Sequence, residues 1–201
     1  MHPASFISSF KRFVSILVLL ALVLAGVAFF GRALAVVDGP KKNGPFLQDD
    51  REYDVLFFGS SHMVNGVFPM VLWKDYGLTS YNLGGHGASI AASYWELRLA
   101  TQYRKPKVAV LDVLFAGSQV TDMELGLAHE LLDIYPLSRT KAEAVQDLFE
   151  ERGTRAEMLF PLDVYHNRWK ELDSGMVRRG LRGERAYSPE KGSQIRAGLY
   201  P

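Results

Sequence analysis

Three apolar segments that each end in a loop limit the fold of this chain most strongly. Residues 53–58, 80–83 and 107–114 have the composition of β-strands, and the first two run into the loops Gly59-Ser60-Ser61-His62 and Gly84-Gly85-His86-Gly87. Helical patterns follow these two loops, and strands that alternate with helices form parallel sheets through right-handed crossovers. We therefore predict an α/β fold whose three loops meet at one edge of the sheet. Because residues 107–114 are almost continuously apolar, we expect a central strand that is covered on both faces.

The predicted helices carry their own start and stop signals. Residues 69–77 begin with proline and end with glycine, and residues 88–104 have apolar side chains at helical spacing. Thr121-Asp122-Met123-Glu124 and Thr140-Lys141-Ala142-Glu143 match the capping box that opens a helix. Gly153 stands where the second of these helices would stop. These two later helices are expected to pack against the rest of the domain.

An uncharged apolar stretch precedes the predicted sheet. Residues 13–31 lie between Lys11-Arg12 and Arg32, and a helix of this length rises about 28 Å, close to the roughly 30 Å thickness of a bilayer core. We predict an uncleaved signal anchor with a cytoplasmic amino terminus; the alternative is a signal peptide cleaved after Ala35, and both export the domain. The predicted division is a cytoplasmic tail over residues 1–12, a transmembrane segment over 13–31, a linker over 32–52 and a globular domain over 53–201.

Composition excludes several classes of function. The 201 residues include 23 Lys and Arg against 22 Asp and Glu, so the net charge of +1 attracts neither nucleic acid nor an acidic partner. The chain has 0 Cys, which excludes disulfides, thiolate metal sites and a cysteine nucleophile. We expect no metal ion and no cofactor, because no His or carboxylate pair has a ligand spacing together with a suitable partner. The basic, glycine-dotted sequence beyond Tyr165 is predicted to be a solvated or incompletely packed tail, and the alternative is a patch that binds anions.

Ser61 is the first candidate for chemistry. It follows the strand predicted at 53–58, and in open parallel sheets catalytic groups collect beyond the carboxyl ends of the strands. One interpretation is a nucleophilic serine. The other is a Gly-Ser-Ser turn that only caps the next segment, because glycine and serine are common in turns.

The two loops together resemble the SGNH/GDSL hydrolase superfamily. The serine of that family's first block, Gly-Asp-Ser-Leu, falls on Ser61, with Gly59 before it and Ser60 in place of the aspartate. This replacement is similar to membrane-anchored teichoic-acid D-alanyl transfer proteins. The second block, Asn-x-Gly-x-x-Gly, starts at Asn82 and makes Gly87 a backbone donor to the oxyanion, and His86 is expected to contact substrate at the rim.

The third and fourth blocks match less closely. Leu114-Phe115-Ala116 replaces the family's Gly-x-Asn, so the oxyanion hole would have backbone donors only. Asp112, at the end of the same predicted strand, is expected either to orient the serine loop or to accept structural hydrogen bonds from N–H groups. The last block, Asp-x-x-His, has its literal spacing in Asp163 and His166. His166 would take the proton from the serine, and Asp163 would hold the imidazole in one tautomer. The alternative is a relay pair beyond this chain, since two strands of the usual five-stranded sheet are unaccounted for.

The resemblance implies a three-layer flavodoxin-like sheet, incomplete in an amino-terminal fragment, behind one transmembrane helix. It further implies a serine esterase or acyltransferase that acts on ester or acyl groups of cell-envelope polymers or acylated glycans. A rival interpretation is a non-catalytic envelope assembly or carbohydrate-binding protein that keeps the fold. A third is a truncated product without stable function.

Overall fold

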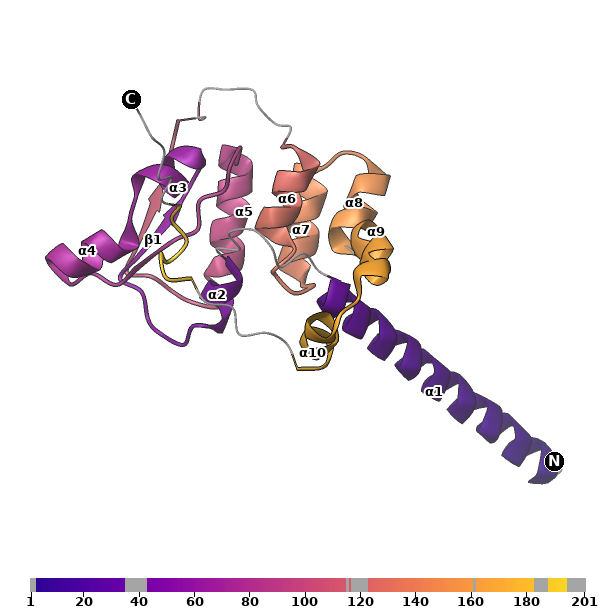
Figure 1. Cartoon of the computed structure of the whole chain (residues 1–201). Helices are drawn as coiled ribbons and strands as arrows, with labels where there is room; N and C mark the ends of the chain where they lie inside the picture. Colours follow the sequence, from indigo (N-terminus) through magenta and orange to yellow (C-terminus); the bar gives the residue numbers. More distant parts are fainter. Residues whose placement is uncertain are drawn as a thin grey trace. The chain divides into compact units, whose positions relative to one another are not determined.

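The computed structural model describes residues 3–34, 43–114, 116, 123–160, 162–182 and 188–194 (Figure 1). The chain divides into two compact units, and each is treated by itself. The helical unit comprises Met1–Val36 and Leu162–Glu184, and the sheet unit comprises Val37–Pro161 and Arg185–Pro201.

The sheet unit contains a parallel three-stranded sheet. Its strands are β1 (Val55–Phe58), β2 (Ser80–Asn82) and β3 (Val108–Leu111), in the order β2-β1-β3. Val55 pairs with Ser80 on one side and with Val108 on the other. The prediction of a parallel α/β sheet is confirmed. Because all three strands run the same way, the loops that follow them leave from one edge.

β3 differs from the prediction, which placed it at the centre of the sheet. Among the described strands it lies at an edge and β1 lies at the centre, so the expectation of a strand covered on both faces is wrong. Val108 is 52% exposed and Leu111 is also exposed, whereas Leu56 and Phe58 of β1 are fully buried. Continuous apolar sequence indicates a strand suited to burial, but it does not say which neighbours cover it.

The helices that follow β1 and β2 along the sheet unit are α3 (Ser61–Gly66), α4 (Pro69–Tyr76) and α5 (Ile90–Ala100). The predicted helix over 69–77 is confirmed: it ends at Gly77, whose φ of 68° lies in the left-handed region that glycine favours. α5 is shorter than the predicted 88–104. Its start is set by Ser89, whose side chain accepts a hydrogen bond from the N–H of Ala92.

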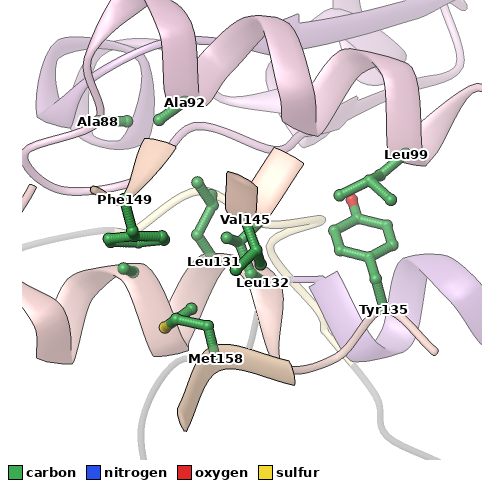
Figure 2. Packing of buried hydrophobic residues seen from close by; sticks show 10 residues of the cluster. Ala88, Ala92, Leu99, Leu131, Leu132, Tyr135, Val145, Phe149 and Met158 are labelled. Carbon is green, nitrogen blue, oxygen red and sulfur yellow. The ribbon is translucent and has the colours of Figure 1, made fainter. Parts of the chain in front are cut away.

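Three further helices build a second hydrophobic core with α5. They are α6 (Leu125–Leu132), α7 (Arg139–Leu148) and α8 (Arg152–Leu159). Figure 2 shows Leu99 of α5 in this cluster with side chains from all three helices, among them Leu131, Val145 and Met158. The predicted packing role of the helices around 125–132 and 139–148 is therefore confirmed.

The predicted helix boundaries here need correction. Ser138, not the box at 140–143, caps α7, because its side chain accepts from the N–H of Lys141. Gly153 lies inside the first turn of α8 instead of stopping α7. Thr121 and Asp122 of the other predicted capping box lie outside the described residues. Serine at 138 offers the same cap chemistry as Thr140 two residues earlier, and the sequence pattern alone does not choose between them.

The predicted linker and the predicted tail both contain packed segments. Within 32–52, α2 (Asn43–Gln48) buries Phe46 completely against Tyr53 and Tyr81, so an unpacked linker is wrong for this part. Residues 188–194 pack on β2, where the N–H of Asn82 donates to the carbonyl of Lys191 at 2.9 Å. A solvated tail is therefore wrong for 188–194.

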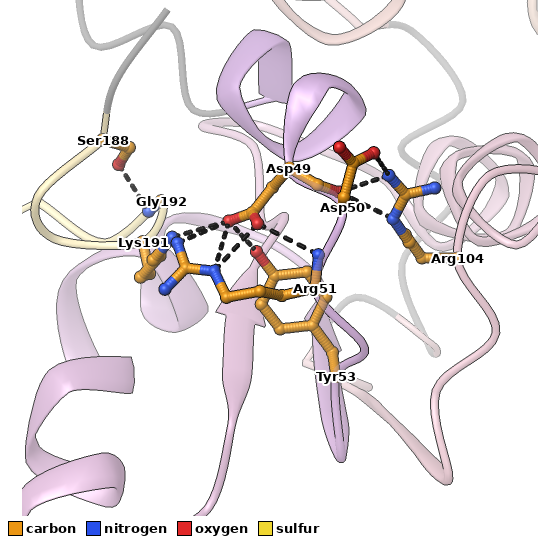
Figure 3. Close-up of polar contacts among 8 residues, drawn as sticks. All are labelled: Asp49, Asp50, Arg51, Tyr53, Arg104, Ser188, Lys191 and Gly192. Atoms are coloured by element: carbon orange, nitrogen blue, oxygen red, sulfur yellow. Dashed lines mark hydrogen bonds and ion pairs between the residues drawn. The ribbon is translucent and has the colours of Figure 1, made fainter.

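A carboxylate ties these two packed segments together (Figure 3). Asp49, directly after α2, accepts hydrogen bonds from Arg51, from the Tyr53 hydroxyl at 2.7 Å and from Lys191 Nζ at 2.8 Å. Burial raises the pKa of Asp49, but the bonds from Arg51, Lys191 and Tyr53 outweigh it and hold the pKa well below its usual range. This contact depends on residues 142 positions apart and has no local sequence signal.

The helical unit consists of α1 (Pro3–Leu34), α9 (Leu162–Tyr165), the 3-10 helix η1 (His166–Glu171) and α10 (Ser174–Arg182). Among the described helices, one is long and apolar enough to cross a membrane: the 22 residues Phe10–Gly31 of α1. Their side chains are exposed within this unit, as a lipid-facing helix requires.

A buried histidine in the hydrophobic core of α5 to α8 predicts that the stability of the fold depends on pH. His129 of α6 is buried, with Nδ1 2.9 Å from Asp133 and Nε2 3.7 Å from Glu157 of α8. Burial lowers the pKa of His129, but Asp133 and Glu157 outweigh it, so the pKa in the folded chain lies above the unfolded value of 6.5. The protonated ring then stabilises the fold at pH below 6.5, and this contribution is lost as the pH rises through the raised value.

We expect denaturant unfolding to show a stability difference between wild type and His129→Gln that is largest at about pH 6 and shrinks by about pH 8.5. Glu130→Gln, at an exposed neighbouring position on α6, is the control and should show no such trend. A difference that stays constant across this range would contradict the charged His129 pair.

Candidate functional site

The loops after β1 and β3 are joined through Ser60. The Ser60 hydroxyl donates to Asp112 Oδ2 at 2.7 Å, and the Ser60 N–H lies 3.4 Å from the same oxygen. The other carboxylate oxygen of Asp112 accepts from the N–H of Leu114 at 2.9 Å. The prediction that Asp112 orients the serine loop is confirmed, and so is its structural role, because its two oxygens serve both loops.

Burial raises the pKa of Asp112, but hydrogen bonds from Ser60 and Leu114, together with the positive potential of His62, outweigh it and lower the pKa overall. The carboxylate is therefore ionised at neutral pH and acts as an acceptor only. It cannot serve there as a general acid.

His62 is a member of this cluster that the sequence analysis did not identify. Its Nδ1 lies 3.2 Å from the Ser60 hydroxyl oxygen, and its ring is exposed. In a catalytic relay the imidazole stands between the carboxylate and the hydroxyl. Here the hydroxyl of Ser60 stands between Asp112 and His62, so this order holds the loop in place instead of activating Ser60. The signal in the sequence is the i to i+2 spacing from a helix-capping serine.

Ser61 begins α3 directly after the β1 loop and is half-buried. Its hydroxyl makes no hydrogen bond with the part of the chain that the structure describes, in contrast to Ser60. A hydroxyl without an internal partner remains able to meet a ligand or a base. The arrangement assigns different tasks to the two serines: Ser60 is structural and Ser61 is available for chemistry.

Asn82 connects the β2 loop to α3 and to Val67, the residue that follows α3. Its buried side-chain amide donates to the carbonyl of Met63 at 2.6 Å and to that of Val67 at 2.9 Å, and its Oδ1 accepts from the N–H of Gly84 at 3.0 Å. Both N–H groups of the amide are thereby engaged. Asn82 belongs to the predicted substrate loop, but its side chain positions the loops and has no donor left for a substrate.

Gly87 and His86 lie farther along the same loop. Gly87 has a φ of 64° and is exposed, and its N–H donates to none of the described residues. This is compatible with the predicted oxyanion donor. His86 Nε2 lies 2.9 Å from Gln194 Oε1, and the Gln194 N–H donates to the carbonyl of Val64. The β2 loop is therefore attached to residues 188–194 as well as to α3.

The predicted relay pair falls in the other unit. Asp163 lies in α9 and His166 begins η1, both within the helical unit, whereas Ser61 belongs to the sheet unit. The side chain of Asp163 lies outside the described residues, and so does Phe115 of the third block. The pairing of Asp163 and His166 with Ser61 therefore stays a prediction.

A cavity of about 270 Å³ lies at the opposite end of the sheet, where β2 begins. Its walls combine exposed apolar side chains with two cations and a few hydroxyl groups, from Arg51, Tyr53, Pro69, Met70, Trp73, Thr79, Ser80, Pro189 and Lys191. Trp73 is 53% exposed. The volume lies just below the roughly 300–1,000 Å³ of typical ligand pockets, so it suits a single ring.

Within the described residues, no group of three or more His, Asp or Glu side chains is placed to hold a metal ion. No protein-family model, curated protein or solved structure matches this chain.

The close packing of the β1 loop against β3 predicts that Gly59 is essential. Its φ is 146°, and a Cβ atom there would lie 2.3 Å from the Cβ of Asp112. We expect Gly59→Ala to cost about 2 kcal/mol or more in the free energy of unfolding, because it adds backbone strain to a clash with Asp112. Gly66→Ala in α3 is the control, since nothing lies within 4 Å of the added methyl group. Equal midpoints of unfolding for the two variants would contradict this account.

Proposed function

We propose that this protein is a membrane-anchored serine hydrolase or acyltransferase of the SGNH type that acts on ester or acyl groups of cell-envelope polymers. The observation that carries the proposal is the difference between two adjacent serines at the carboxyl edge of a parallel sheet. Ser60 is locked to Asp112, and Ser61 presents a hydroxyl without a partner among the described residues. Asn82 and Gly59 support the loop that would hold this hydroxyl.

In the proposed reaction, Ser61 Oγ attacks the carbonyl carbon of an ester and loses its proton to a base. The new C–O bond turns the carbonyl oxygen into an oxyanion, which the N–H groups of Gly87 and Ser61 would stabilise. Collapse of this intermediate breaks the bond to the leaving oxygen, which takes the proton from the base. Water or a second hydroxyl then releases the acyl group from Ser61, giving hydrolysis or transfer.

The base proposed for this reaction is His166, oriented by Asp163, or else a pair that lies beyond this chain. The replaced third block would leave the oxyanion without a side-chain amide. Loss of one such donor lowers kcat about a hundredfold or more, so slow turnover is expected.

The proposed location follows from the helix over Phe10–Gly31, which is long and apolar enough to span a bilayer. We propose that it anchors the chain with the sheet unit on the extracytoplasmic side. The substrates within reach are then polymers and acylated glycans of the envelope.

A fluorophosphonate probe, which reacts with activated serine hydroxyls, tests the proposal on the full chain in detergent. Wild type should be labelled, and Ser61→Ala should abolish labelling because the reacting oxygen is gone. Ser60→Ala is the matched control: it should lose about 1 kcal/mol of stability with its helix cap, yet keep measurable labelling. Labelling that vanishes only in Ser60→Ala would assign the nucleophile to Ser60 instead. An unlabelled wild-type protein with a cooperative unfolding transition would refute a hydrolase whose base is His166.

The alternative function is non-catalytic binding of carbohydrate, and the cavity at the start of β2 favours it. Trp73 and Met70 offer an exposed apolar wall, and the cations Arg51 and Lys191 lie close to it. Asp49 pairs with both cations and holds them at this wall, where their N–H groups would donate to the carboxylate of an acidic sugar.

If the alternative holds, Trp73→Ala should weaken binding of a uronic-acid oligomer by about tenfold, because the ring loses its stacking surface. Isothermal titration of the full chain would measure this. Trp169→Ala, which removes an equally exposed tryptophan from the helical unit, should leave the affinity unchanged. Binding that is absent from wild type, or lost equally in both variants, would exclude this cavity as the site.

A further inference from the structure

The carboxyl end of α1 carries a collar of short helices, which we define as α9, η1 and α10. α10 packs on α1 at Gly180, where an added Cβ atom would lie 2.5 Å from the ring of Phe29 and 3.0 Å from the Cβ of Ala33. Only glycine permits this approach. η1 is attached independently, because Arg168 donates to the carbonyl of Leu34 at 2.7 Å, the last residue of α1.

These contacts determine the level of the collar relative to a membrane. The apolar span ends at Gly31, and Ala33 and Leu34 lie within three residues of it. A helix rises 1.5 Å per residue, so the attachment extends from Phe29, about 3 Å inside the end of the apolar span, to Leu34, about 5 Å beyond it. The polar layer on each side of the hydrocarbon core is about 5–8 Å thick. The collar is therefore held at the boundary between the hydrocarbon core and the lipid headgroups wherever α1 spans the bilayer.

The collar exposes the side chains that this layer favours. Trp169 is 60% exposed and Leu181 is 69% exposed. On α10, Met176 and Gly180 form the buried side, and Arg178 and Leu181, three residues apart, share the opposite face. Lys170 follows Trp169 and is exposed. Tryptophan is enriched at membrane interfaces, and helices that lie there combine apolar side chains with Lys and Arg.

The net charge of the collar indicates which kind of lipid it would bind. The sequence of residues 162–182 contains five cationic residues, Arg168, Lys170, Arg178, Arg179 and Arg182, and three acidic residues, Asp163, Glu171 and Asp173. Two of the anions have structural tasks, since Glu171 pairs with Arg168 and Asp173 caps α10 by accepting from the N–H of Met176. The net positive charge attracts anionic headgroups.

We propose that the collar is a lipid-binding element that inserts Trp169 and Leu181 among the headgroups around α1 and binds anionic phospholipid through Lys170 and Arg178. It would hold the chain's extramembrane part close to the bilayer surface. The inference rests on the membrane span of the proposed function but not on Ser61 or on any reaction.

The test uses the full chain in lipid nanodiscs, with Trp73→Phe and Trp95→Phe so that Trp169 is the sole fluorophore. Phosphatidylcholine brominated near the top of its acyl chains should quench Trp169, and admixed phosphatidylglycerol should increase the quenching. Lys170→Gln with Arg178→Gln should remove most of this increase, since each cation contributes about fivefold to the attraction. Lys74→Gln with Arg152→Gln, which removes the same charge from exposed positions on the sheet unit, should not.

Leu181→Gln provides a second variant at a position too exposed to disturb folding, and it should reduce quenching in both lipids. A chain that inserts into the nanodisc but shows Trp169 unquenched overturns the inference alone. A chain that does not insert overturns the membrane span as well. Neither outcome bears on labelling of Ser61, so the two proposals fail separately.

Discussion

The buried amide of Asn82 is the contact on which the arrangement of the sheet unit depends. Its side chain binds the carbonyls of Met63 and Val67 and the N–H of Gly84, and its backbone N–H binds Lys191. One residue thus joins β2, α3 with the residue that follows it, and the distant segment 188–194. A buried polar group that loses its partner costs roughly 1–3 kcal/mol, so all these connections are energetically coupled to one site.

A second set of contacts, at the same edge of the sheet, gives the adjacent residues Ser60 and Ser61 different roles. Gly59 lets the β1 loop approach β3, and Asp112 then takes the hydroxyl and N–H of Ser60. With Ser60 occupied, the adjacent hydroxyl of Ser61 is left without an internal partner among the described residues. These contacts give the proposed nucleophile a rigid support, because Asp112, directly after β3, supplies a carboxylate that binds the adjacent Ser60.

The helical unit has a different physical basis. Its long helix exposes apolar side chains over a length sufficient to cross a bilayer, which suits the proposed membrane anchor. The collar is attached to the last turns of that helix by a glycine contact and by a hydrogen bond to a carbonyl that the helix itself cannot satisfy. Anchoring and proposed catalysis thus reside in separate units of the chain.

The sequence predicted an element correctly where neighbouring residues are sufficient to cause it. The apolar runs at 53–58 and 80–83, the helix between Pro69 and Gly77, and the long uncharged segment follow from periodicity, caps and length, and each appears in the structure. The edge position of β3, the burial of Phe46 and the packing of 188–194 on β2 could not be predicted, because their partners lie far away in the chain.

In the candidate site, too, some features could be predicted from the sequence and others could not. The sequence by itself determined that Ser60, Ser61, His86 and Gly87 lie just beyond the carboxyl ends of strands, since strand direction and crossover handedness require it. Only the tertiary structure decided which serine is engaged by Asp112, that His62 contacts Ser60, and that the amide of Asn82 is used internally. Hydrogen bonds between loops depend on distances of a few tenths of an ångström, and these are determined by how the strands and helices pack, not by the order of the residues.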